Sequence, residues 1–270
     1  MKKPLSEESR LPSLDNQQGR LYIVGIGPGS TDQMTGRARE VLMQSDVIIG
    51  NDSYLAQLGP LIGGKEVIRS SMGQEVERAK RSIELSRSHS VCMVSGGDAG
   101  IYGMASIVLE VLEHEGEDID IEVIPGITAA NAAASLLGSP LSGDFAAVSL
   151  SDLLTPIEEI EKRLHAAFSM GTPVVLYNPK SRGRPHNFAL AMEIAGKYRN
   201  STTPIGIVKN AYREGEEIMI ITLGDIAVAD GMIDMHTTVI VGGEESRIWR
   251  KGQYVKGIIT PRGYHRKYLY

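Results

Sequence analysis

The stretch Val91-Cys92-Met93-Val94-Ser95-Gly96-Gly97-Asp98-Ala99-Gly100-Ile101-Tyr102-Gly103 decides the fold of this chain. Its first residues form a short apolar run typical of a buried strand, the paired glycines end that run, and helical spacing follows over 104–114. In open α/β sheets, ligands bind beyond the carboxyl ends of the strands, which is where this loop falls. The alternative is an ordinary strand-to-helix turn in which Asp98 caps the helix.

The same order of strand, loop and helix recurs on both sides of this stretch. Apolar runs predict strands at 21–24, 47–49, 66–68 and 121–124, and helical spacing covers 31–45, 52–61, 74–87 and an alanine-rich segment ending at Leu137. Loops of small residues at 25–30 and 125–131 follow the first and last of these strands. The pattern predicts a mainly parallel sheet with a ligand-binding edge.

The loop at 25–30 matches the dinucleotide fingerprint G-x-G-x-x-G only in part. Ser30 stands in place of the third glycine, and Pro28 removes a backbone donor from the part that would hold a pyrophosphate. Asp46 precedes its strand instead of ending it, so it is badly placed to meet a ribose. We therefore disfavour a nicotinamide cofactor.

Glycine and proline interrupt the pattern around 138–144 and indicate a domain boundary. We expect a flexible tail at 1–19, an N-terminal α/β domain at 20–141, a C-terminal α/β domain at 142–264 and a basic tail at 265–270. The second domain has predicted strands at 146–150, 172–177, 205–208, 218–221 and 237–241, with a helix at 155–168. Short turns between some of these strands predict antiparallel pairs and a mixed sheet. Two α/β lobes would then enclose a cleft.

Composition excludes several function classes. The chain has 270 residues, 42% of them hydrophobic, and a formal net charge of −5, so nothing global points to nucleic acid or to an anionic membrane. The single cysteine, Cys92, fits a reducing compartment, and the six histidines show no metal-ligand spacing. No run reaches the ~18 apolar residues of a membrane span, and the first twenty residues lack the apolar centre of a signal peptide. We expect a cytoplasmic protein.

Several motifs together resemble the tetrapyrrole methylases, the S-adenosylmethionine-dependent enzymes of corrin and sirohaem synthesis. In the first half the matching segments are 25–29, 95–98 with Tyr102, and 125–130. In the second half, 149–156, 176–182 and 260–264 resemble the branch that methylates carbon 17 of precorrin-3B or cobalt-factor III and contracts the ring in cobalamin biosynthesis. The resemblance covers about 20–264 and implies a two-lobed fold with the methyl donor in the cleft between the lobes.

The resemblance also implies which residues hold S-adenosylmethionine, mainly through backbone groups. Carried over position by position, they are Pro28, Gly96, Gly97, Asp98, Ile101, Tyr102, Thr128, Ala129, Leu150, Asn178 and Ala211. Ala99 departs from the proline that more commonly follows the aspartate, which affects the stiffness of the loop. Asn178 favours the corrin branch, because sirohaem-type relatives tend to carry methionine there.

The implied substrate is a macrocycle with many carboxylates, so cations should line its binding site. One cluster comprises Lys180, Arg182, Arg184 and His186, and a second comprises Arg262, His265, Arg266 and Lys267. Arginine binds carboxylates in a bidentate fashion. We expect substrate contacts from Lys180, Arg182, Arg184 and Arg262, whereas the other cations of the second cluster could equally form a solvated tail.

In the implied reaction a ring carbon attacks the methyl group in line, while the protein orients the reactants and excludes water. Contraction of the ring needs proton transfers, for which the unranked candidates are Asp98, Asp144, Asp152, Tyr177 and His186, each of which could instead be a cap or turn residue. Relatives are homodimers, and Cys92 alone cannot hold the iron-sulfur cluster of some family members. The alternatives are another tetrapyrrole methylase, of the uroporphyrinogen-III type or for a different corrin carbon, and a non-catalytic tetrapyrrole carrier. A nucleic-acid methylase is disfavoured, since the sequence lacks a broad basic stripe.

Overall fold

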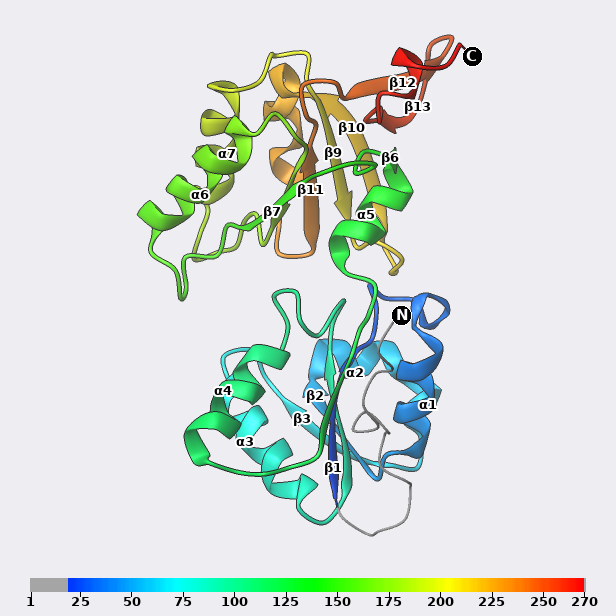
Figure 1. Cartoon of the computed structure of the whole chain (residues 1–270), viewed down its shortest axis with the longest axis vertical. Coiled ribbons are helices and arrows are strands. Elements are labelled where there is room, and N and C mark those ends of the chain that lie inside the picture. The colour runs from blue at the N-terminus through cyan, green and yellow to red at the C-terminus, as the bar shows by residue number, and fades with distance from the viewer. Residues whose placement is uncertain (1–18, 270) are drawn as a thin grey trace, which may run out of the picture.

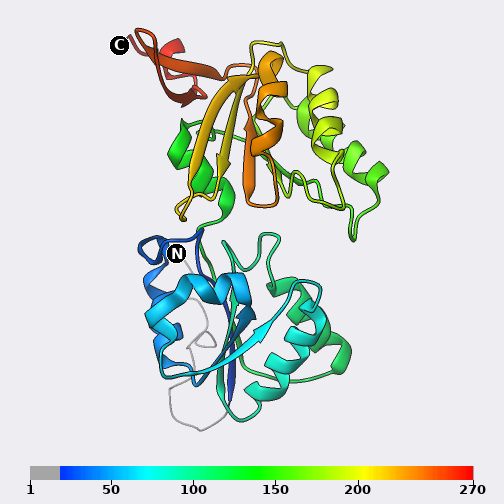
Figure 2. The same cartoon turned by 180° about the vertical axis from the view of Figure 1, so that it is seen from behind.

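A computed structural model describes residues 19–269 of the chain, so the tail expected at 1–19 lies outside the described residues except for Gly19. Two α/β lobes are stacked along the long axis of the molecule, as Figure 1 shows and as Figure 2 shows from behind. The two-lobed α/β architecture that the sequence predicted is therefore confirmed.

The first lobe is built on a sheet of five parallel strands in the order β3-β2-β4-β1-β5. These strands are β1 (Arg20–Gly25), β2 (Val47–Asn51), β3 (Glu66–Ser70), β4 (Ser90–Ser95) and β5 (Ile121–Ile124). Because all neighbouring pairs are parallel, the carboxyl ends of all five strands meet at one edge of the sheet. That edge faces the second lobe (Figure 1), which positions the loops at 26–29, 96–103 and 125–128 beside it.

Helices cover both faces of this sheet, namely α1 (Gly36–Gln44), α2 (Asp52–Leu58), α3 (Glu75–Ser86) and α4 (Ala105–Glu115). The helix expected over 31–45 is interrupted: a 3₁₀ turn at Thr31–Gln33 comes first, and α1 then begins after Thr35, whose hydroxyl accepts from the N–H of Ala38 at 3.2 Å. The helix expected over 52–61 ends at Leu58, because Pro60 cannot continue it, and a 3₁₀ turn at Gly59–Ile62 follows.

The second lobe contains a mixed sheet in the order β10-β9-β11-β8-β7, as predicted. Its strands are β7 (Ala146–Ser149), β8 (Val174–Tyr177), β9 (Pro204–Lys209), β10 (Glu217–Thr222) and β11 (Thr237–Val241). β7 and β8 are parallel, whereas β11 runs antiparallel to both β8 and β9. The carboxyl ends of β7, β8 and β9 therefore lie at the same edge, and this edge meets the first lobe.

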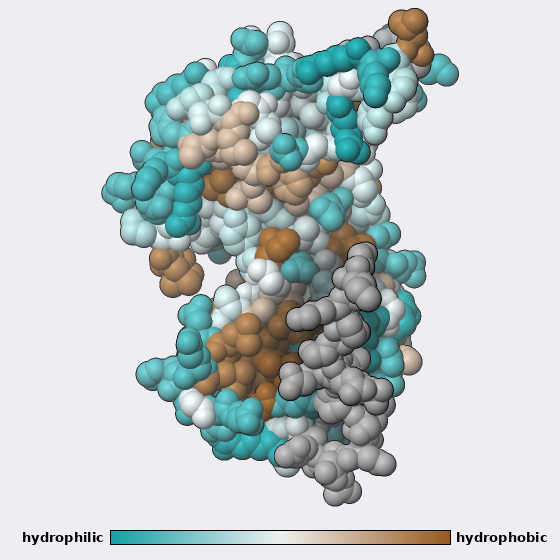
Figure 3. All heavy atoms as spheres, viewed as in Figure 1, coloured by the Kyte–Doolittle hydropathy of each residue, from teal (hydrophilic) through white to brown (hydrophobic). Residues whose placement is uncertain are grey.

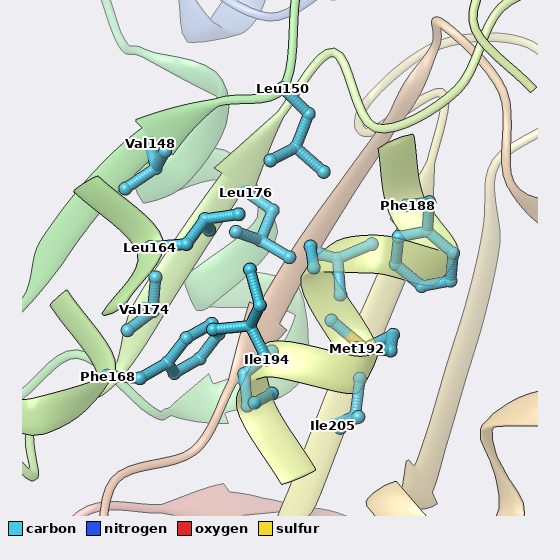
Figure 4. Close-up of a cluster of buried hydrophobic side chains, with 14 of the residues drawn as sticks. Val148, Leu150, Leu164, Phe168, Val174, Leu176, Phe188, Met192, Ile194 and Ile205 are labelled. Carbon is cyan, nitrogen blue, oxygen red and sulfur yellow. The ribbon is translucent and has the colours of Figure 1, made fainter. Parts of the chain in front are cut away.

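One face of the second sheet is covered by α6 (Ile157–Ser169), α7 (Asn187–Gly196) and the 3₁₀ segment η4 (Leu223–Met232). Phe168, Leu176 and Ile205 lie fully buried in the apolar core beneath these helices (Figure 4). No helix was expected at the position of α7. Its apolar residues are spread around the helix instead of forming a single stripe, so the sequence carried little periodic signal there.

The other face of the second sheet is covered by α5 (Ala129–Leu137), although the sequence had placed this helix in the first domain. Ala133 and Leu137 of α5 pack against Val175, Val208 and Ile240 of the second sheet. The chain thus passes from one lobe to the other in the loop at 125–128. This packing favours a domain boundary there, before α5, over the boundary expected at 141.

A third, small sheet was not predicted at all. It joins β12 (Arg247–Lys251), β13 (Tyr254–Ile259) and β6 (Gly138–Ser139), and a 3₁₀ turn at Tyr264–Arg266 follows it. The sheet lies at the end of the second lobe that is farthest from the first lobe (Figure 1). Within residues 19–269, no helix is long and apolar enough to cross a membrane.

Candidate functional site

Three loops at the edge of the first sheet are held together by backbone hydrogen bonds and by the carboxylate of Asp98. Gly27 donates to the carbonyl of Gly97 at 3.0 Å, and Gly97 donates back to Gly27 at 2.8 Å. The Asp98 carboxylate joins the remaining loop: its Oδ1 accepts from Gly100 at 2.8 Å and from Ile101 at 3.0 Å, and its Oδ2 accepts from Gly126 at 2.9 Å. Asp98 is therefore the residue that ties the loops after β4 and β5 together.

Glycine is required where these loops touch. A Cβ atom on Gly126 would lie 2.1 Å from the carbonyl oxygen of Gly97, and one on Gly25 would lie 2.7 Å from the Gly126 nitrogen. Gly27 and Gly97 also have φ angles of +79° and +67°, which L side chains rarely adopt. The glycines that the sequence singled out thus allow backbone to pack on backbone at this edge.

Two tyrosines connect the edges of the lobes. The rings of Tyr102, from the first lobe, and Tyr177, at the end of β8, have centroids 4.9 Å apart. The Tyr177 hydroxyl shares a hydrogen bond with Thr128 Oγ1 at 2.6 Å and accepts from the Ala130 N–H at 3.0 Å. The Tyr102 hydroxyl donates to the carbonyl of Ala147, in β7, at 3.3 Å. Tyr177 therefore fixes the start of α5 just where the chain enters the second lobe.

Burial raises the pKa of Tyr177 and that of Tyr102 above the ordinary value of 10.0. Both phenols are consequently neutral at physiological pH. A neutral hydroxyl can donate one hydrogen bond and accept others, which is what the contacts of Tyr177 with Thr128 and Ala130 require.

Backbone strain gathers at the same place. Among the described residues, four non-glycine residues have positive φ: Tyr102, Asn178, Asn210 and Tyr212, at 50° to 59°. Tyr102 lies in the loop after β4, Asn178 directly follows β8, and the other two follow β9. Such strained conformations cluster at ligand-binding and catalytic sites. The side chain of Asn178 is held by its Nδ2, which donates to Ser149 Oγ at 3.0 Å.

The remaining residues expected to bind the methyl donor lie at the same two edges. The carbonyl of Pro28 accepts from Arg213 Nε, which joins the loop after β1 to the loop after β9. Leu150 is fully buried and donates its N–H to the Tyr177 carbonyl at 2.9 Å, and Ala211 packs against the core beneath α5. The structure thus brings together segments from both lobes that the sequence could only place separately.

A pocket of about 640 Å³ opens between the lobes beside these residues. The first lobe contributes Tyr102 and the beginning of α4, and the second contributes β7, the loop at 149–155, α6 and Asn178. In Figure 3 the lobes are separated by an indentation on this side of the molecule, with apolar atoms on both of its banks. A cavity of this size lies within the usual range for small-molecule sites, roughly 300–1,000 Å³.

The three cations of the loop after β8 that were expected to bind the substrate differ in their polar contacts. Lys180 Nζ pairs with Asp230 Oδ1 at 2.7 Å. Arg184 Nε lies 3.2 Å from Ser181 Oγ and 3.7 Å from Asp152 Oδ1, while its Nη1 is buried without a hydrogen-bond partner. Arg182 is exposed. In the loop after β8, Lys180 and Arg184 therefore already contact polar groups of the chain itself.

Arg262 does not lie at the cleft of its own chain. It follows β13, in the segment that the small third sheet leads away from the first lobe (Figure 1), and its guanidinium stacks over the Tyr264 ring at 5.8 Å. The strand pair β12–β13, which carries the chain to this end of the molecule, was not predicted from the sequence.

The candidates for proton transfer differ in how far their polar atoms are engaged. Both carboxylate oxygens of Asp98 accept backbone hydrogen bonds, and the Tyr177 hydroxyl is engaged by α5. Asp152 pairs with Arg184, whereas Asp144 and His186 are exposed. No group of three or more His, Cys, Asp or Glu side chains in residues 19–269 is arranged to hold a metal ion.

Comparisons with known proteins agree with this geometry. The sequence profile of the Tetrapyrrole (Corrin/Porphyrin) Methylases matches residues 20–227. A probable cobalt-factor III C(17)-methyltransferase of Salmonella typhimurium is 44% identical over 247 residues, which make up 90% of this chain and 99% of that protein. The crystal structure of the methyltransferase CobJ superposes with a TM-score of 0.81 at 34% identity, covering 88% of this chain and 99% of that one.

Several relatives are considerably longer than this chain. A cobalamin biosynthesis protein of Archaeoglobus fulgidus is 44% identical over 252 residues, which are 93% of this chain and 54% of that protein. The chain therefore spans about half the length of this curated relative.

Proposed function

The chain belongs to the tetrapyrrole (corrin/porphyrin) methylase family, and from this premise we propose that it transfers the methyl group of S-adenosylmethionine to carbon 17 of cobalt-factor III or precorrin-3B. The same reaction contracts the macrocycle, as one step of cobalamin biosynthesis. The observation that carries this proposal is the 44% identity to a probable C(17)-methyltransferase over 90% of the chain, because that match spans both lobes.

The cleft suits a donor that is held by backbone groups. The loop at 96–102 turns sharply at Gly97 and Tyr102; Gly96 and Gly97 carry no side chain that would keep a ligand from their peptide groups, and the side chains of Ile101 and Tyr102 are about half exposed. Thr128, Ala129, Asn178 and Ala211 would complete the donor site from the opposite edge. S-adenosylmethionine supplies an electrophilic methyl group on a sulfonium, so the chain itself needs to supply only position and shielding from water.

Position matters because the attacking carbon and the methyl group must approach to roughly 3–3.5 Å in line. The contact between Tyr102 and Tyr177 and the link from Arg213 to Pro28 hold the two lobes together around the donor site. The interlocked glycine loops fix the donor, and the pocket beside them leaves room for the macrocycle. The two lobes thereby orient the methyl donor and the macrocycle relative to each other.

Proton transfers during ring contraction need a side chain that is free to exchange protons. Asp98 and Tyr177 are committed to holding the loops and α5, so we assign both of them a positioning role. Asp144, Asp152 and His186 then remain as candidates for the acid and base. Replacing each of the five residues in turn and analysing the product tests this assignment, and full ring contraction by all five variants would contradict it.

We further propose that the protein acts in the cytoplasm as a homodimer, with no cofactor besides the methyl donor. The fully buried Cys92 supports the location, because an isolated, shielded thiol fits a reducing compartment. Analytical ultracentrifugation tests the dimer, and a purely monomeric protein at micromolar concentration would contradict it.

The proposed reaction is tested by incubating the protein with methyl-labelled S-adenosylmethionine and either metal-free precorrin-3B or cobalt-factor III. We expect label in the macrocycle together with an absorption change as the ring contracts, with one of the two macrocycles preferred. If the protein were instead a carrier of tetrapyrroles, isothermal titration with S-adenosylmethionine would give no heat. Label on a different carbon would identify another tetrapyrrole methylase.

A further inference from the structure

Two adjacent leucines protrude from the second lobe beside the pocket. Leu153 and Leu154 have 80% and 90% of their surface exposed, in the loop between β7 and α6. In Figure 1 this loop reaches down toward the first lobe, and Figure 3 shows apolar atoms at the same place. Both leucines line the pocket of about 640 Å³. Adjoining apolar side chains that are left so exposed are typical of a surface that binds something.

The rest of the pocket has a consistent chemical character. Its walls are mostly apolar and include Ile107 from α4, Met170 after α6 and the small residues of β7. Arg163, on α6, is the one charged residue among those that line it. Its only ion-pair partner among the described residues is Glu159, at 3.4 Å, and its side chain remains 56% exposed. The guanidinium is therefore available to a further carboxylate.

We propose that this pocket holds one face of the tetrapyrrole, that Leu153 and Leu154 fold down onto the ring, and that Arg163 binds a carboxylate at its periphery. This inference rests on the proposed function and assigns residues to its substrate. A tetrapyrrole has flat apolar faces and acidic side chains at its rim, which matches apolar walls beside a single cation. The pocket is continuous with the donor site, because Tyr102 and Asn178 belong to both.

The leucines are tested by the double variant Leu153→Ser/Leu154→Ser. We expect the KM for cobalt-factor III or precorrin-3B to rise about 10- to 100-fold, since burying each leucine side chain on the ring would contribute to binding. The affinity for S-adenosylmethionine, measured by titration calorimetry, should change less than about twofold. Leu153→Met/Leu154→Met should restore most of the KM, because methionine keeps the apolar volume.

Leu109→Ser is the matched control for the leucine pair. Leu109 is also exposed, at 45%, but it lies on α4 outside the pocket lining, so its KM should equal that of the wild type. Exposed leucines do not stabilise the core, and all of these variants should unfold at the wild-type temperature. That measurement separates a binding effect from misfolding.

Arg163 has a matched control in its neighbour. Lys162 also pairs with Glu159, at 3.9 Å, but it does not line the pocket. Arg163→Gln should raise the KM about fivefold at low ionic strength, and the difference should vanish in roughly 0.5 M salt, because exposed charges are then screened. Lys162→Gln should leave the KM unchanged at both ionic strengths.

The outcomes distinguish this inference from the function on which it rests. If the wild-type protein methylates the macrocycle but the serine variant keeps the wild-type KM, the macrocycle binds elsewhere. The proposed function then still stands. A serine variant that loses affinity for S-adenosylmethionine as strongly as for the macrocycle also overturns the inference. If the wild-type protein transfers no methyl group to a tetrapyrrole, both proposals fall.

Discussion

The two edges that face each other across the cleft are built in different ways. In the first lobe, backbone hydrogen bonds join the loops after β1 and β4, the Asp98 carboxylate joins the loop after β5 to them, and Gly25 and Gly126 lie so close to backbone atoms that no Cβ atom fits at either position. In the second lobe, the loops at 150–156 and 178–186 are joined to each other by the partly exposed ion pair of Asp152 with Arg184, and the first of them carries two protruding leucines. We therefore expect the edge of the first lobe to be rigid and the edge of the second lobe to change conformation more readily.

This difference matches the two molecules that the cleft is proposed to bring together. A methyl donor must be aligned to within fractions of an ångström, and a rigid surface of peptide groups is suited to this task. A large macrocycle that must enter, react and leave suits side chains that can swing and repack. The comparison predicts that substitutions in the first edge damage stability and donor binding, whereas those in the second affect mainly the macrocycle.

The largest effect is expected from Gly126→Ala. Its new methyl group would lie 2.1 Å from the Gly97 carbonyl oxygen, so the loops must separate, at a cost of about 3 kcal/mol or more in the free energy of unfolding. Binding of S-adenosylmethionine should become undetectable by calorimetry. Gly183→Ala is the control from the second edge: with open space around its Cβ, it should change stability by less than about 0.5 kcal/mol. Equal stability of the two variants would remove the distinction between the edges.

A smaller effect is expected from Asp98→Asn. Asparagine replaces one carboxylate oxygen by an NH₂ group, so it cannot accept hydrogen bonds from the N–H groups of Gly100, Ile101 and Gly126 together. The free energy of unfolding should therefore fall by about 1–3 kcal/mol, and the affinity for S-adenosylmethionine should fall as well. Asp152→Asn removes a pair 3.7 Å long on the second edge and should cost under about 1 kcal/mol. Thermal unfolding and calorimetry check both variants. A donor affinity that survives Asp98→Asn intact would show that the carboxylate does not organise the loops.

Tyr177→Phe tests the connection between the edges. Loss of the hydroxyl leaves Thr128 Oγ1 and the Ala130 N–H without this partner, which should lower the free energy of unfolding by about 1–2 kcal/mol. Because Tyr177 is assigned a positioning role, the variant should bind S-adenosylmethionine more weakly yet still form the ring-contracted product. Product that is methylated but not contracted would instead identify Tyr177 as an acid or base.

The smallest effect is expected from Glu122→Gln, on strand β5. Arg37 donates to the Glu122 carboxylate at 2.8 Å and 3.1 Å, and this lowers the pKa of Glu122 below its ordinary 4.5. A lowered pKa means that the pair stabilises the fold above about pH 4.5 and that this contribution disappears as the pH falls through the folded-state value. The variant should be less stable by under about 1 kcal/mol at pH 7 and equal to the wild type at low pH. A larger loss would mean that charge, as well as backbone packing, holds the first lobe rigid.

The sequence predicted the parallel sheet and its loops because both depend on local signals. The apolar run at 91–94 and the paired glycines after it specify a buried strand and a close turn, and the structure confirms the loop at the sheet edge. The antiparallel pairing of β9 with β10 followed equally from the short connection between them. Asn178 could be singled out only through the family resemblance, although asparagine tolerates the positive φ that this position adopts.

What the sequence missed depends on contacts between distant segments. The helix α5 follows the first sheet in the chain but packs on the second, and only the three-dimensional arrangement reveals that Ala133 and Leu137 face Val175 and Ile240. The displacement of Arg262 follows from the unpredicted pairing of β13 with β6. Leu153 and Leu154 come just before the helix predicted at 155–168, and only their exposure beside a pocket indicates a role.

The most direct test of the difference between the edges is a crystal structure of the protein soaked with S-adenosylhomocysteine, the product of the methyl donor. We predict that the ligand lies in the cleft against the backbone of 96–102, with Thr128 and Asn178 on its other side, and that the glycine loops keep their positions. A ligand bound anywhere else, or glycine loops that move apart to admit it, would contradict the account of a rigid donor edge.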